Sequence, residues 1–196
     1  TKKWIMSLAV HDQINFYSSK DLKEWNLESE FGKNIGSHGG IWECPDLFPL
    51  KDVNGDTKWV LLVSLNPNGP QGGSATQYFI GDFNGKTFTS DDHKIKWLDY
   101  GADNYAGVTF SDIPKEDGRR ILIGWMSNWQ YSQVVPTYAW RSAMTLPREL
   151  LLRQNNNEYY IQSKPIAEIK NVFNSSELIT SKKHKIDTPS YLIEIS

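Results

Sequence analysis

Short runs of alternating apolar and polar residues follow one another along most of the chain. The first three cover residues 4–10, 14–19 and 25–28, and turn-forming residues separate them. A period of two is typical of a strand with one face in a core and the other in solvent. Farther along, Asn84-Gly85 is a common hairpin turn. The pattern predicts an all-β protein built from short antiparallel strands.

The strand pattern recurs twice. Residues 58–65 and 77–83 repeat the first two runs about 55 positions later, and a third copy begins at 108–110. A repeat of roughly 50 residues made of short strands is typical of β-propeller blades, and no amphipathic helix of comparable length competes with it. Three copies cannot close a ring, so residues 1–164 are predicted to form part of a propeller.

Charge and composition exclude several classes of partner. The 196 residues carry 21 Lys and Arg against 23 Asp and Glu, a formal net charge of −2. Because no basic stripe occurs, we expect neither nucleic acid nor a membrane as a partner. The single cysteine, Cys44, excludes an internal disulfide, and the four histidines lack the spacing of metal ligands, so we expect no metal site and no cofactor. Eight Trp and nine Tyr offer flat faces for sugar rings, although most would also suit a β core.

The candidate chemistry lies in residues 39–49, where a single carboxylate, Glu43, stands in apolar backbone. Burial beside Trp42 would raise the pKa of Glu43, because desolvation disfavours the charged form, and a protonated carboxyl is a proton donor. Pro45 is expected to hold Cys44 extended, so that the carboxyl projects from a fixed frame. The alternative is a strand-edge glutamate paired with an arginine.

Residues 42–48, Trp-Glu-Cys-Pro-Asp-Leu-Phe, resemble the Glu-Cys motif of glycoside hydrolase family 32, which includes invertases, levanases and inulinases. Residues 124–131, 136–143 and 146–150 are similar to the levanase and exo-inulinase branch. The resemblance implies hydrolysis of terminal β-D-fructofuranosyl residues from sucrose, levan or inulin by a retaining mechanism. It also implies a five-bladed propeller followed by a β-sandwich. Residues 165–177 would then be a linker and 178–196 the first part of the sandwich.

The resemblance assigns the general acid/base role to Glu43. We interpret Trp129 as an apolar wall for the fructosyl ring and place Trp42 and Asp103 among the substrate-binding residues. Asp103 lies in a segment similar to the family's Asp-Phe-Tyr-Ala, with Asn104 in place of the Phe. The alternatives are a propeller-core tryptophan and a solvated turn aspartate. Arg141 would form a structural ion pair or hold the carboxyl of Asp103 or Glu43.

Two family segments do not occur in this sequence. The nucleophile of the family lies in Asn-Asp-Pro-Asn-Gly and the transition-state stabiliser in Arg-Asp-Pro, and neither string is present. We therefore expect an internal piece of a longer enzyme that carries the acid but not the nucleophile. The rival hypothesis is a carbohydrate-binding propeller without catalysis, which would keep Trp129 and Asp103 but not need Glu43 as an acid. The family points to a secreted or extracellular protein, with a cytoplasmic location left open.

Overall fold

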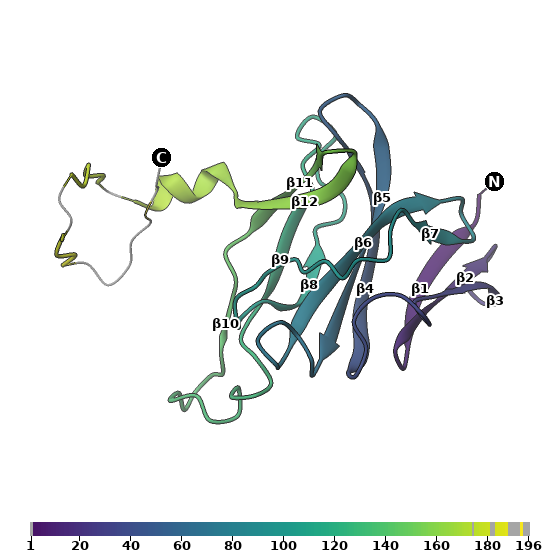
Figure 1. Cartoon of the computed structure of the whole chain (residues 1–196), viewed down its shortest axis with the longest axis horizontal. Coiled ribbons are helices and arrows are strands. Elements are labelled where there is room, and N and C mark those ends of the chain that lie inside the picture. The colour runs from purple at the N-terminus through teal and green to yellow at the C-terminus, as the bar shows by residue number, and fades with distance from the viewer. Residues whose placement is uncertain (1, 174, 181–182, 188–192, 194–196) are drawn as a thin grey trace.

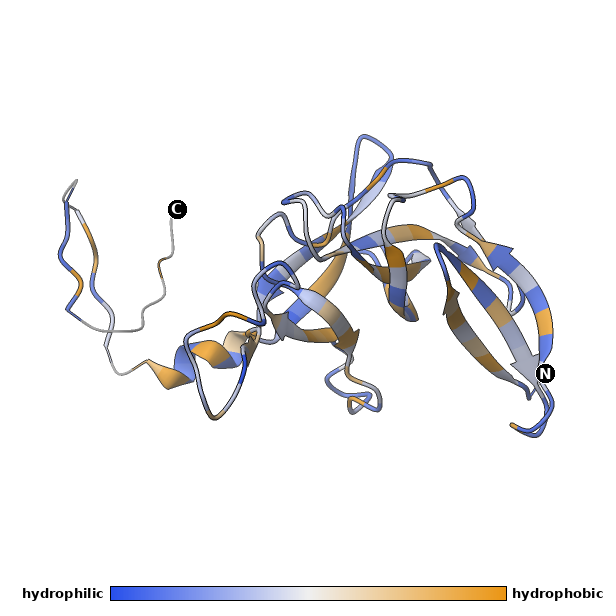
Figure 2. Cartoon of the chain, turned by 90° about the horizontal axis from the view of Figure 1, so that it is seen from below, coloured by the Kyte–Doolittle hydropathy of each residue, from blue (hydrophilic) through white to orange (hydrophobic). Residues whose placement is uncertain are grey.

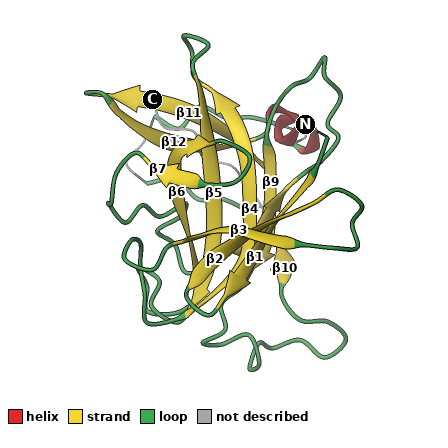
Figure 3. Cartoon of the chain, turned by 90° about the vertical axis from the view of Figure 1, so that its right-hand side faces the viewer, coloured by secondary structure: helices red, strands yellow, loops and turns green. Residues whose placement is uncertain are grey.

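The computed structural model describes residues 2–173, 175–180, 183–187 and 193. These residues form twelve strands and one short 3-10 helix, η1 (Figure 3). The prediction of an all-β fold is confirmed. In chain order the elements are β1 (Trp4–Val10), β2 (Gln13–Ser19), β3 (Asn26–Phe31), β4 (Ile41–Lys51), β5 (Thr57–Asn66), β6 (Ala75–Phe83), β7 (Phe88–Ser90), β8 (Tyr105–Thr109), β9 (Ile121–Met126), β10 (Ala143–Met144), β11 (Arg148–Asn155), β12 (Glu158–Pro165) and η1 (Ala167–Val172).

The strands make three antiparallel sheets, and each sheet uses consecutive strands of the chain. The first sheet has the order β1-β2-β3 and the second β4-β5-β6-β7. In the third, Trp125 of β9 pairs with Tyr105 of β8 and also with Met144 of β10, so β8 and β10 lie on opposite edges of β9. Because Leu122 pairs with both Thr109 and Arg148, β11 follows β10 along the same edge. The third sheet therefore repeats the plan of the second.

The first strands of the three sheets lie next to one another, with β4 between β1 and β8 (Figure 1). The amide of Trp42 on β4 donates to the carbonyl of His11, at the turn after β1, over 2.8 Å. On its other side β4 is tied to β8, because both the amide and the hydroxyl of Thr109 donate to Asp46. The second sheet is thus held between the other two.

β5 explains why the second sheet is central. Alternate residues of this strand point into two separate cores, and both sets are buried. Leu61, Val63 and Leu65 belong to one core with residues of β2, whereas Val60 and Leu62 belong to another with residues of β9 and β11. A strand covered on both faces has no polar alternation left, which is why residues 60–63 are apolar throughout. On other strands polar and apolar residues do alternate (Figure 2).

Beyond β12 the chain leaves the sheets. The 3-10 helix η1 has no buried residue and projects away from the strands (Figure 1). Residues 175–180, 183–187 and 193 carry no strand, and the rest of the predicted sandwich segment lies outside the described residues. The domain boundaries therefore stay predictions. Within the described residues no helix is long and apolar enough to cross a membrane.

Candidate active site

A bulge on β4 sets the direction of Glu43. Glu43 pairs with Ser64 and Asp46 with Leu62, so two residues of β4 stand opposite a single residue of β5. Pro45 has no N–H to offer to the ladder, and the register breaks at this point. The prediction of an extended Cys44 is wrong, because its φ is 48°, in the left-handed region. Such a backbone costs about 1–3 kcal/mol and occurs where a strand is bent to aim a side chain.

The predicted burial of Glu43 beside Trp42 is also wrong. Trp42 is 1% exposed, but Glu43 is exposed, because neighbouring residues of a strand point to opposite faces. The indole of Trp42 stacks on the His38 ring with centroids 5.3 Å apart, and its Nε1 donates to the carbonyl of Ser37 over 2.9 Å. Trp42 thus lies in the core directly behind the backbone of Glu43, and its predicted contact with substrate stays a prediction.

Tyr105 is a site residue that the sequence analysis did not single out. Its hydroxyl donates to Oε2 of Glu43 from the neighbouring strand β8. The ring is 3% exposed, and burial, followed by the hydrogen bond to the Glu43 carboxylate, raises the pKa of Tyr105 far above its ordinary value. It is therefore a neutral donor. A second bulge lies beside it, where Ala106 has a φ of 52°, so an irregular backbone flanks both ends of this hydrogen bond.

Two of the predicted binding residues, Trp129 and Asp103, are connected to the surroundings of Tyr105. The rings of Tyr105 and Trp125 have centroids 6.3 Å apart, and those of Trp125 and Trp129 are 5.2 Å apart. Trp129 is 49% exposed, so one part of the indole packs on Trp125 and the rest is accessible. Asp103 accepts a hydrogen bond from the hydroxyl of Tyr131, which belongs to the turn that carries Trp129. One continuous set of side chains therefore links Glu43 to the accessible face of Trp129.

Comparison with known proteins now decides the family. Residues 1–165 match the family described as Glycosyl hydrolases family 32 N-terminal domain. The chain belongs to this family. It is 49% identical over 181 residues to a levanase of Bacillus subtilis (strain 168), covering 90% of this chain and 27% of the levanase. It is 44% identical over 177 residues to an extracellular exo-inulinase of Aspergillus niger, covering 84% of this chain and 32% of that protein.

Solved structures agree with this assignment. The fold superposes on an exo-inulinase from Aspergillus awamori with a TM-score of 0.76 and 40% identity, over 83% of this chain and 33% of that one. A fructofuranosidase from Schwanniomyces occidentalis complexed with fructose gives a TM-score of 0.75 and 37% identity over the same shares. This family 32 chain thus spans about a third of the length of the relatives that it matches, or less.

The contact of Arg141 differs from the expectation for the family 32 site. The Arg141 guanidinium donates to the carbonyl of Val135 over 3.1 Å, rather than to Asp103 or Glu43. Asp103 is held by Tyr131 and makes no hydrogen bond to Glu43 among the described residues. Cys44, next to the motif glutamate, has its pKa raised by burial and then by the charge of Glu43, so it is a neutral thiol near pH 7.

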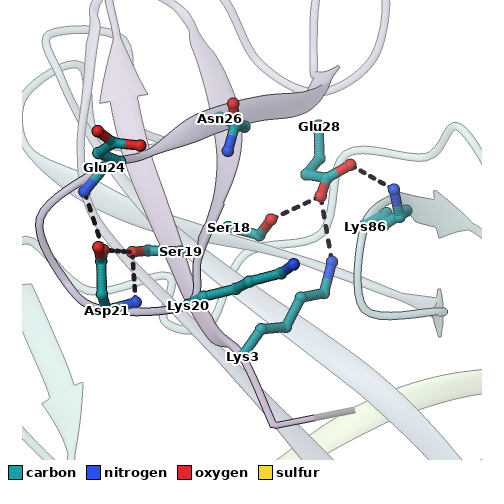
Figure 4. A pocket seen from close by; sticks show the side chains of 9 residues that line it. All are labelled: Lys3, Ser18, Ser19, Lys20, Asp21, Glu24, Asn26, Glu28 and Lys86. Carbon is teal, nitrogen blue, oxygen red and sulfur yellow. Dashed lines mark hydrogen bonds and ion pairs between the residues drawn. The ribbon is translucent and has the colours of Figure 1, made fainter.

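Two hollows of the family 32 chain lie outside the cluster of the Tyr105, Trp125 and Trp129 rings. One, of about 490 Å³, touches Asp103 and extends to the Arg148–Asp99 ion pair, whose N–O distance is 2.5 Å. The other, of about 520 Å³, lies on the first sheet (Figure 4). There Glu28 accepts hydrogen bonds from Lys86, Ser18 and Lys3, which lower its pKa to about 2. No aromatic ring lines this hollow, so it lacks the stacking surface of a sugar site.

Metal ligands are absent from the part of the chain that the structure describes. No three His, Cys, Asp or Glu side chains come together there in a way that could hold an ion.

Proposed function

We propose that the complete enzyme hydrolyses terminal β-D-fructofuranosyl residues of sucrose or of fructans such as levan and inulin, with retention of configuration. Membership of family 32 supports the reaction class, and the names of the levanase and exo-inulinase relatives support the substrates. The observation that carries the proposal is the exposed carboxyl of Glu43 on the β4 bulge, held by the buried hydroxyl of Tyr105.

Glu43 is the proposed general acid/base. It protonates the leaving oxygen in the first step and takes a proton from water in the second. Exposure matters here because the leaving oxygen must reach the carboxyl. One oxygen of Glu43 accepts from Tyr105, which leaves the other to face the substrate. The attacking carboxylate of a retaining enzyme lies about 5–5.5 Å from the acid, and we infer that it comes from the Asn-Asp-Pro-Asn-Gly segment, which these 196 residues do not contain.

The binding roles follow from the side chains around Glu43. Trp129 supplies an apolar wall, because its partly exposed indole is fixed against Trp125. Asp103 accepts a sugar hydroxyl with the carboxylate oxygen that Tyr131 does not use. For Trp42 we propose an indirect contribution, in which the buried indole supports the backbone of Glu43 from behind. These roles need neither a metal nor another cofactor.

The architecture of the complete enzyme is also a proposal. We interpret the three sheets as consecutive blades of a five-bladed propeller, because their first strands adjoin and the second and third share one strand plan. Residues 178–196 would begin the β-sandwich after a linker at 165–177. The extracellular exo-inulinases among the relatives support a secreted enzyme whose partners are neutral fructosides.

Leaving-group dependence tests the acid role. Glu43→Ala in the complete enzyme should lower turnover of sucrose by about 10²–10⁴-fold, whereas an activated aryl fructoside, which needs less protonation, should lose much less. Glu30→Ala, which removes an exposed carboxylate of β3, is the matched control and should leave both rates unchanged. Equal losses on the two substrates would contradict the acid role and would favour a sugar-binding protein.

A further inference from the structure

Asn128 has a buried amide that uses its full hydrogen-bonding capacity. The residue is 0% exposed. Its Oδ1 accepts from the amides of Ser74 (3.2 Å) and Gln130 (3.0 Å). Its Nδ2 donates to the carbonyls of Ala102 (2.8 Å) and Ser74 (3.4 Å). An amide offers two donor hydrogens and two acceptor lone pairs, so no capacity is left for a ligand.

These bonds join three segments that are far apart in sequence. Ser74 ends the loop between β5 and β6, Ala102 lies in the stretch before β8, and Gln130 belongs to the turn after β9. The backbone of this loop approaches the Asn128 amide so closely that a side chain at Gly73 would clash, since its Cβ would lie 2.2 Å from Oδ1 of Asn128. The same loop also holds the next residue directly, since the amide of Trp129 donates to the hydroxyl of Ser74 over 3.1 Å.

Both proposed sugar-binding groups depend on this junction. Trp129 follows Asn128 in the chain, and Asp103 follows Ala102. Tyr131, whose amide donates to the carbonyl of Asn128 over 3.2 Å, also donates its hydroxyl to Asp103. The buried amide of Asn128 therefore helps to place the indole and the carboxylate relative to one another, together with the hydrogen bonds that Ser74 and Tyr131 make to them.

We propose that Asn128 is a positioning residue of the fructosyl site and sets the separation of the Trp129 ring and the Asp103 carboxylate. The inference rests on the proposed function, because it names the geometry that the fructosyl ring needs. Replacement by Ala leaves four polar groups of three segments unsatisfied, which weakens the connection between these segments. Small displacements of binding groups are enough to lower turnover, because the reacting atoms must be held in one geometry.

The first test is made on the complete enzyme with sucrose. Asn128→Ala should lower kcat/KM by about tenfold to a hundredfold. The matched control is Ser132→Ala in the same turn, because Ser132 is 3% exposed and its Oγ has no partner among the described residues. The control should stay within about twofold of the wild type. A folded Asn128→Ala enzyme with wild-type kcat/KM would overturn the inference.

A double-mutant cycle separates positioning from general stability. If Asn128 acts through Trp129, then Trp129→Ala should cost less in the Asn128→Ala enzyme than in the wild type. Additive losses would overturn the inference, as would a Trp129→Ala enzyme of unchanged activity. Should Asn128→Ala fail to fold, Ser74→Ala takes its place. It removes the acceptor of the Trp129 amide, together with the donor to Oδ1 of Asn66, and should lower kcat/KM about threefold to tenfold with the same non-additivity.

Failure of the proposed function has a different signature. A wild-type complete enzyme that releases no fructose from sucrose, levan or inulin would overturn the proposed function itself. An active wild type with an unaffected Asn128→Ala variant would overturn only the positioning role.

Discussion

Two carboxylates flank the bulge of β4, and both reach across to β8. On one side Asp46 is partly buried and accepts from the amide of Thr109 at 2.7 Å and from its hydroxyl at 2.8 Å. On the other side Glu43 is exposed and accepts from the hydroxyl of Tyr105. The same two strands therefore hold one carboxylate that is committed to the fold and one that still faces solvent.

The side chains around the two carboxylates also differ. Near Asp46, the Arg120 guanidinium donates to the Thr109 hydroxyl over 3.3 Å and lies 4.8 Å from the centre of the Phe48 ring. Near Glu43 the neighbours are aromatic, and the last of them, Trp129, is half exposed. The difference indicates that Asp46 stabilises the junction of two sheets, whereas Glu43, the proposed acid, stays accessible to a ligand.

Exchanging each of the two acids for its amide in the complete enzyme tests this difference, and Glu43→Gln should have the largest effect on activity. Glu43→Gln should lower kcat on sucrose by about 10²–10⁴-fold while changing the free energy of unfolding by less than about 0.5 kcal/mol, because the side chain is exposed and nearly isosteric. Steady-state kinetics together with urea denaturation measure both quantities. A large decrease in the free energy of unfolding of the Glu43→Gln enzyme would contradict the proposed difference between Glu43 and Asp46.

Asp46→Asn should give the reverse result. The amide can still accept from Thr109, but two charge-assisted hydrogen bonds become neutral ones, so we expect a loss of about 1–2 kcal/mol in the free energy of unfolding. kcat on sucrose should fall by less than about threefold, since the group does not face the site. Urea denaturation of the complete enzyme gives the first value, and an inactive but stable Asp46→Asn enzyme would show that the division is wrong.

Tyr105→Phe sharpens the comparison on the Glu43 side. The change removes the donor to Glu43 while keeping the buried ring, so kcat/KM on sucrose should fall about tenfold through a less ordered acid. Because the pKa of Tyr105 is raised, the hydroxyl stays protonated through neutral pH, and the ratio of wild-type to variant kcat/KM should be constant between about pH 5 and 8. A ratio that changes steeply in this range would identify a titrating tyrosine instead.

Glu28 is a third carboxylate that accepts several hydrogen bonds, as Asp46 does, but it lies on the first sheet. Its replacement should have the smallest effect. Its pKa falls from 4.5 to about 2 in the folded state, mainly through Lys86, then Ser18 and Lys3. A lowered folded pKa adds stability above pH 4.5, and that stability is lost as the pH falls toward 2. Glu28→Gln should therefore lower the thermal midpoint slightly at pH 6 and have almost no effect near pH 2. A difference that grows on acidification would contradict the assignment.

The local sequence determined most of the strands. Period-two alternation predicted strands at residues 4–10, 14–19 and 58–65, and the structure has β1, β2 and β5 there, because the pleat fixes which residues share a face. The Trp-Glu-Cys-Pro segment likewise indicated the family, which the match over residues 1–165 confirms. These features are readable because each depends on residues that are neighbours in the chain.

Tertiary structure decided the rest. Whether Trp42 is a core or a pocket residue depended on which face of β4 meets the first core, and the register break at Pro45 fixed the direction of Glu43. Tyr105 lies 62 positions from Glu43, and Asn128 lies 54 from Ser74, so neither partnership leaves a signal in any local window of sequence. Such contacts exist only once three sheets have packed, because hydrogen bonds between loops require the separation and orientation that the assembled cores impose.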